Sequence, residues 1–106
     1  RKIFILNRRI DQLTSLLNGV NTDDFVLFAL AKEYFKIADF ARSIEFFEQL
    51  IQKNKNYTGA YYHFALALRE QGLEEKAMEI IHRGIEICKE TNQTHDRNEL
   101  LTLLES

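Results

Sequence analysis

The chain has 106 residues with nearly balanced charge, 14 Lys and Arg against 16 Asp and Glu. A chain of this length forms one domain that can bury a core without disulfides or metals. No long block of one sign occurs, so the charge gives no footprint for nucleic acid or for an anionic membrane surface. The apolar run at 3–6 is too short for a signal peptide core or a membrane span of roughly 18 residues, so neither is expected.

Cys88 is the single cysteine of the chain, so no disulfide can form within it. A lone cysteine favours a reducing compartment, and a cytoplasmic location is expected. We expect Cys88 to be a small buried side chain rather than a reactive thiol.

The composition favours helix along the whole length, with no proline and only four glycines. No stretch alternates apolar and polar residues long enough to indicate a strand. Breaks at 18–23, 38–39, 54–58, 72 and 91–94 delimit six helices of roughly 11 to 16 residues. Since the connections are short, sequential helices should pack as antiparallel neighbours, and the predicted fold is all-α.

Two segments repeat each other at an offset of 34 residues. In the first helix of each segment, Leu27, Leu30, Ala31 and Tyr34 match Tyr61, Phe64, Ala65 and Leu68. In the second helix, Ser43, Ile44, Phe47, Leu50 and Ile51 match Ala77, Met78, Ile81, Gly84 and Ile85. Ala38 and Gly72 mark the same turn, and Ile10, Leu13, Leu16 and Leu17 extend the second-helix pattern backward. Small residues at matched positions would let paired helices approach closely.

This 34-residue pattern of large, small and polar positions resembles the tetratricopeptide repeat. The departures are Lys55 and Lys89, where the family often has Pro, and Leu50, where a small residue is usual. The resemblance implies a right-handed α-solenoid of antiparallel helix pairs within one domain, 1–106. Its parts would be an N-terminal half-repeat helix at 1–21, repeat units at 24–57 and 58–91, and a capping helix at 95–106.

The last helix is out of phase with the repeat, because the 34-residue spacing from Phe64 and Leu68 falls on Asn98 and Thr102. An insertion of two residues in the preceding turn would bring Leu100 and Leu104 onto the packing stripe. We therefore interpret this helix as a cap.

In this family, the first helices of successive repeats commonly line a concave groove that holds a partner peptide or helix. The resemblance places Phe25, Phe28, Lys32, Tyr62, Leu66 and Arg69 in that groove, with Phe28 and Tyr62 side by side. An apolar floor with two cations at its edges suits an apolar protein segment that carries acidic residues. The alternative is that Phe25 and Phe28 are core residues packed under the N-terminal helix or the neighbouring pair.

The family's clamp for the C-terminal carboxylate of chaperone peptides fits poorly, because Phe28 and His63 stand where that clamp needs other residue types. The polar outer positions of the second helices, such as Glu45 and Glu79, indicate a solvated convex face.

Catalysis has no support in the sequence. His63, His82 and His95 fall on different predicted helices, and His82 and Cys88 cannot share a helix face. Metal-ligand spacing, phosphate-binding loops and nucleophile motifs are missing from the sequence. We therefore expect no enzyme activity, no metal and no cofactor.

The sequence thus predicts an interaction module that binds a protein or peptide partner. The competing hypothesis is a self-associating structural protein, in which an end face bearing Leu101 and Leu103 forms a homo-dimer.

Overall fold

The computed structural model describes the backbone of residues 2–105 and the side chains of residues 8–105. Its helices are α1 (Lys2–Thr14), α2 (Asp24–Lys36), α3 (Phe40–Lys53), α4 (Ala60–Glu70), α5 (Glu74–Glu90) and α6 (Thr94–Leu103). No strand is formed by residues 2–105. The predicted all-α fold with six helices is confirmed.

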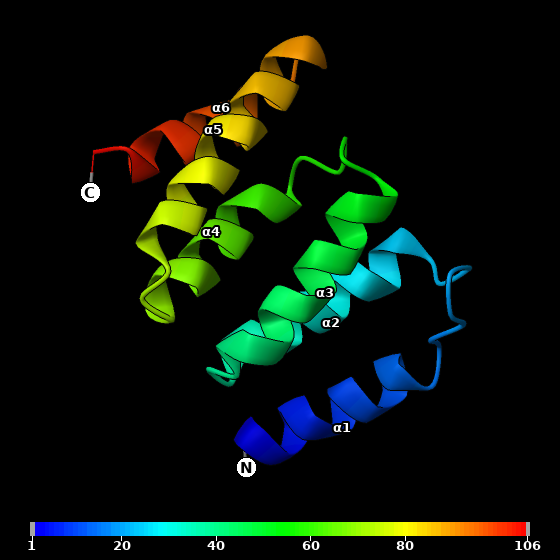
Figure 1. The fold of residues 1–106 in the computed structure, drawn as a ribbon. Coiled ribbons are helices and arrows are strands. Elements are labelled where there is room, and N and C mark those ends of the chain that lie inside the picture. The colour runs from blue at the N-terminus through cyan, green and yellow to red at the C-terminus, as the bar shows by residue number, and fades with distance from the viewer. Residues whose placement is uncertain (1, 106) are drawn as a thin grey trace.

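The helices stack in chain order, with α1 at one end and α6 beside α5 at the other (Figure 1). Each helix contacts the next one in the chain, and α2 also contacts α4, which in turn contacts α6. Within the described part, α3 and α5 make no such backbone contact with each other. The first helices of the pairs therefore lie closer together than the second helices, so α2, α4 and α6 form the inner side of a curved stack.

The turn inside each repeat closes with the same backbone geometry. Ala38 and Gly72 both have a positive φ, 62° and 75°. In the first turn, the Asp39 N–H donates to the Tyr34 carbonyl at 2.9 Å, and in the second the Leu73 N–H donates to Leu68 at 2.9 Å. These bonds satisfy carbonyls that the helix end would leave without a partner. The predicted equivalence of Ala38 and Gly72 is confirmed.

Small residues bring the helices of each pair into close contact, as the sequence predicts. Ser43 is buried and its hydroxyl donates to the Ala31 carbonyl at 2.7 Å, which ties α3 to α2. Gly84 of α5 lies so close to Tyr61 and Leu100 that an added Cβ would be within 3 Å of both. Around these contacts, one large apolar cluster runs from α2 to α6, with Phe47, Tyr61, Phe64 and Leu68 among its most buried members.

The N-terminal helix packs on a smaller apolar cluster of its own, which contains Ile10, Leu13, Val26, Ala29 and Leu30. Next to it, the buried carboxylate of Glu33 on α2 accepts from Arg9 Nε at 2.7 Å and from Lys36 Nζ at 3.2 Å. This ion pair fastens α1 to α2.

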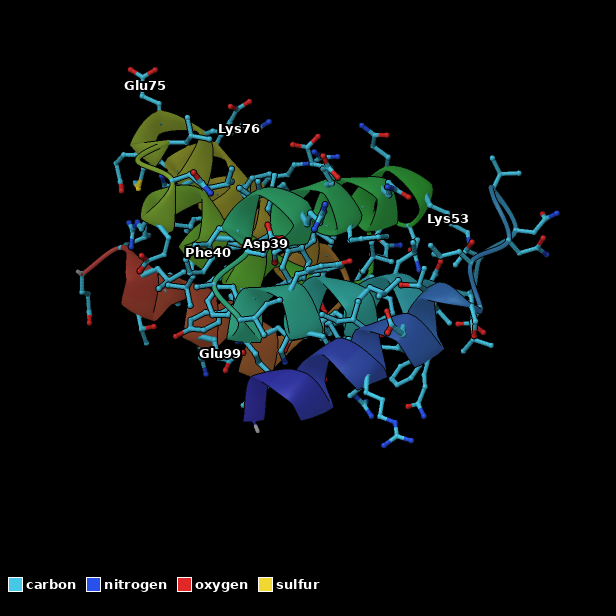
Figure 2. The ribbon with its side chains drawn as sticks, turned by 90° about the horizontal axis from the view of Figure 1, so that it is seen from below. Asp39, Phe40, Lys53, Glu75, Lys76 and Glu99 are labelled. Atoms are coloured by element: carbon cyan, nitrogen blue, oxygen red, sulfur yellow. The ribbon has the colours of Figure 1, made fainter. Side chains whose placement is uncertain are left out.

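Helix α1 ends at Thr14, earlier than the predicted range 1–21. Leu16 and Leu17, expected on the packing stripe, lie in the following turn and are exposed. The loop after them has bonds of its own, since the Asn18 N–H donates to the Thr22 hydroxyl at 2.7 Å and Gly19 has a positive φ. Lys53 at the end of α3 donates to the Thr22 carbonyl, and Figure 2 shows Lys53 next to this loop.

Helix α6 sits in the register that a two-residue insertion predicts, since Leu100 and Leu103 are buried 36 residues after Phe64 and Ala67. Leu104, expected on the packing stripe, is instead 39% exposed and lies just past the last residue of α6, as its C-cap. The predicted end face is also corrected: Leu101 is exposed, but Leu103 is buried.

Candidate functional site

The six residues predicted for the groove lie on two helices that contact each other, α2 and α4. Phe25 is exposed and the other five are half-buried. Phe25 is therefore not a core residue under α1. Phe28 packs against the large apolar cluster and not against the α1 cluster. One side of the Phe28 ring therefore contributes to the core, while the rest of the side chain stays accessible to solvent.

Aromatic contacts organise this surface in a way that the sequence did not predict. Phe28 packs on Tyr57, from the loop between α3 and α4, with ring centroids 5.2 Å apart. Tyr62 packs edge-on against the neighbouring His63, whose other side meets Phe35 of α2, each at 5.2 Å. Phe28 and Tyr62 share no ring contact among the described side chains, and each packs on a different ring instead.

The two predicted cations have different surroundings. The Lys32 ammonium lies 5.1 Å from the centroid of the Phe28 ring, and no described carboxylate is within ion-pair distance of it. Arg69 is tied to the first turn of α5, where its Nε meets the Glu74 carboxylate at 3.1 Å. Lys32 therefore brings positive charge to this surface, whereas Glu74 compensates the charge of Arg69.

His63 is half-buried between α2 and α4. Burial lowers the pKa of His63 to about 4, and the positive charge of Lys32 contributes to the same effect. No residue in the described part of the chain forms a hydrogen bond with the His63 ring, whose nitrogens are not sealed from solvent. At neutral pH the surface of α2 and α4 thus carries a neutral imidazole and, on the other helix, an ammonium group.

Other potentially reactive groups stay apart from this surface. Cys88 is buried as predicted, and burial raises the pKa of its thiol, whereas His82 is exposed. His95, Asp96 and Glu99 bring possible ligand atoms within 4.8 Å of one another in α6. Asp96 already accepts from the Thr58 hydroxyl at 2.6 Å, and we assign no metal to this group.

None of the described helices is both long enough and apolar enough to span a membrane.

A curved stack of antiparallel helix pairs, with an aromatic and apolar inner face, defines a helical-repeat scaffold. Residues 26–57 and 58–91 each match the family model described as "Tetratricopeptide repeat", and the chain belongs to this family. Tetratricopeptide repeats generally mediate protein–protein interaction and are typically non-catalytic.

Solved structures agree with this assignment. A tetratricopeptide repeat domain protein from Salinibacter ruber is 30% identical in its crystal structure, with a TM-score of 0.72 over 76% of this chain and 90% of that one. Its solution NMR structure has a TM-score of 0.71 and covers 76% and 82% of the two chains. The crystal structure of MamA has a TM-score of 0.71 over 95% of this chain and 66% of that one, and at 21% identity it supports the fold alone. No curated protein matches the chain.

Proposed function

We propose that the chain is an interaction module without catalytic activity, which binds a peptide or helical segment of a partner protein on the inner face of α2 and α4. The observation that carries this proposal is the accessible apolar surface on these helices, formed by Phe25, Phe28, Tyr62 and Leu66. Aromatic side chains that can be desolvated at the centre of a contact are the usual anchors of protein interfaces. The outer helices, in contrast, carry exposed charged residues such as Glu75 and Lys76, which project outward in Figure 2.

The proposed partner segment combines apolar side chains with acidic ones, because Lys32 lies at this surface without a described carboxylate partner. We also propose that residues 1–106 act as one unit, with α1 and α6 covering the two ends of the apolar interior.

The test begins with peptides selected from a displayed random library on the folded chain. We expect binding by calorimetry to weaken at least about fivefold in Tyr62→Ala and Phe28→Ala, since truncating an anchor residue costs about 1 kcal/mol or more. Glu45→Ala, on the exposed outer face of α3, is the matched control and should bind normally. Circular dichroism should show nearly unchanged helicity. Equal affinity for all variants, or collapse of the fold in Tyr62→Ala, would argue against the groove.

Self-association is the second candidate function, and the exposure of Leu101 and Leu104 at the end of the stack favours it. A stable dimer in sedimentation experiments that is lost in Leu101→Glu would support it. A monomer at all concentrations would leave the groove as the only candidate.

A further inference from the structure

Lys32 and His63 lie on the contacting helices α2 and α4, and each is close to an aromatic residue of α2. Lys32 is one helical turn before Phe35, the residue that packs edge-on against His63. One turn in the other direction, Phe28 lies under the Lys32 ammonium. The attraction between the Lys32 ammonium and the Phe28 ring is weaker than the attraction that an anion at the same place would provide.

Several charged groups on the surrounding elements have partners of their own. On α2, Lys36 pairs with Glu33, and at the start of α3, Asp39 pairs with Arg42 at 3.3 Å. Two turns along α4 from His63, Arg69 meets Glu74 of α5.

On α6, Glu99 is turned towards His95, with Oε1 and Nε2 4.0 Å apart. Glu70 of α4 and Arg97 of α6 have no described ion-pair partner either, but Lys32 is the charged group whose field acts on His63.

We propose that Lys32 and His63 form one subsite for a carboxylate of the docked segment, the side chain of an Asp or Glu next to an apolar residue, and that its occupation takes up a proton at His63. The inference rests on the groove function proposed above and specifies its ligand chemistry. The incoming carboxylate would neutralise the field of Lys32 and accept a hydrogen bond from the protonated ring, which is stronger than a bond between neutral groups. The proton comes from solvent and returns to solvent when the segment leaves.

This coupling has a defined sign. In the free protein the His63 ring is neutral above a pKa of about 4, because burial and Lys32 both disfavour its charge. A bound carboxylate favours the protonated ring and raises that pKa. Binding and protonation are linked reciprocally, so affinity must increase as pH falls through the window between the free and bound values.

The probe for this subsite is the capped dipeptide acetyl-Phe-Asp-amide, and acetyl-Phe-Asn-amide is its uncharged isostere. An Asp side chain with an ordinary pKa near 3.9 stays ionised at pH 5.5, so pH affects mainly the protein. Chemical shifts of the 106-residue chain are followed by NMR at pH 5.5 and 7.5, together with the titration of the His63 Cε1–H signal with and without the probe.

We expect the Asp probe to bind at least about threefold more tightly at pH 5.5 than at pH 7.5 and to raise the pKa of His63, as linkage requires. The Asn probe should show no pH dependence. Lys32→Met should weaken binding of the Asp probe, most strongly at pH 7.5, where the His63 ring is neutral. His63→Gln should keep a preference for the Asp probe that no longer varies with pH.

Equal binding of the Asp and Asn probes at both pH values, with an unmoved His63 titration, would overturn the subsite. If both probes then still shift Tyr62 and Leu66, the groove function survives without it. If neither probe shifts any inner-face resonance, the subsite is also overturned, and the library peptides decide separately on the groove.

Discussion

Ala38 and Gly72, which are 34 residues apart, have the same left-handed backbone conformation at the turn inside each repeat, with φ of 62° and 75°. Glycine adopts this conformation freely, whereas the Cβ of an L-residue disfavours it by roughly 1–2 kcal/mol. The two repeats therefore form the same type of turn, but the turn with Ala38 is more strained than the turn with Gly72.

The first prediction concerns a single substitution at each of these two positions. Ala38→Gly should raise the free energy of unfolding by about 0.5–1 kcal/mol, because the relieved strain exceeds the entropy that glycine adds to the unfolded chain. Gly72→Ala should lower it by a similar amount, although nothing lies within 4 Å of the added Cβ. Urea unfolding measures both. Changes of the same sign would contradict the explanation by backbone conformation.

The second prediction concerns the close approach at Gly84. In Gly84→Ala the new Cβ would lie 2.8 Å from Leu100 Cδ1 and 2.9 Å from Tyr61 Cβ. Overpacking costs typically 1–3 kcal/mol, and the better helix propensity of Ala returns about 1 kcal/mol. We expect a net loss of up to about 2 kcal/mol in thermal or urea unfolding. Gly59→Ala, with open space around its Cβ, is the control and should change stability by less than about 0.5 kcal/mol; similar losses in both variants would refute the steric account.

The third prediction concerns the attachment of α1 to α2. Arg9→Ala removes one partner of the buried Glu33 carboxylate and leaves Lys36 as the other. Leaving a buried acceptor poorly satisfied costs about 1–3 kcal/mol. Because α1 has a separate small cluster, hydrogen exchange should speed up in α1 and stay slow in α4 and α5. The neighbouring Arg8→Ala is the matched exposed control; equal exchange in the two variants would remove the assigned role of the ion pair.

The fourth prediction is a pH dependence of stability. The pKa of His63 is about 4 in the folded protein and near 6.5 in the unfolded chain, so the unfolded state binds more protons between these values. The free energy of unfolding should therefore fall as pH is lowered from 6.5 towards 4, by about 1–2 kcal/mol after allowance for the partial exposure of the ring. Urea titrations at several pH values test this, with His63→Gln losing the slope and the exposed His82→Gln retaining it.

Asp24 does not obscure that window. A hydrogen bond from Asn54 and the nearby Lys53 lower the pKa of Asp24. The contribution of the ionised Asp24 to stability is therefore lost only at more acidic pH, where the Asp24 carboxylate of the folded protein takes up a proton. A slope above pH 4 that persists in His63→Gln would assign the effect to another group.

The repeat architecture could be predicted because it depends on periodic side-chain size. Small residues such as Ser43 and Ala31 allow the two helices of a pair to come into contact, and the residues at Ala38 and Gly72 form the same turn in both repeats. Neither feature depends on the identity of the surrounding side chains. The two-residue shift of the last helix was also visible, since only that shift aligns Leu100 with Phe64.

The contacts within the candidate site could not be predicted from the sequence, because they depend on the conformations of flexible side chains. Arg69 can reach either the groove or Glu74, and spacing alone does not decide between them. Tyr57 lies in a turn, outside any helical period, yet it packs on Phe28. Likewise, the early end of α1 follows from hydrogen bonds within the loop around Thr22 rather than from a periodic signal.

The register of the end helices has a consequence for growth of the stack. Leu101 stands where the interior first helices have Ala31 and Ala65, and Arg9 stands where the second helices have Ser43 and Ala77. A further helix packed against either end at the interior spacing would have to accommodate these longer side chains. Stacking of further identical pairs on these ends would therefore need a wider helix spacing than the interior of the stack has.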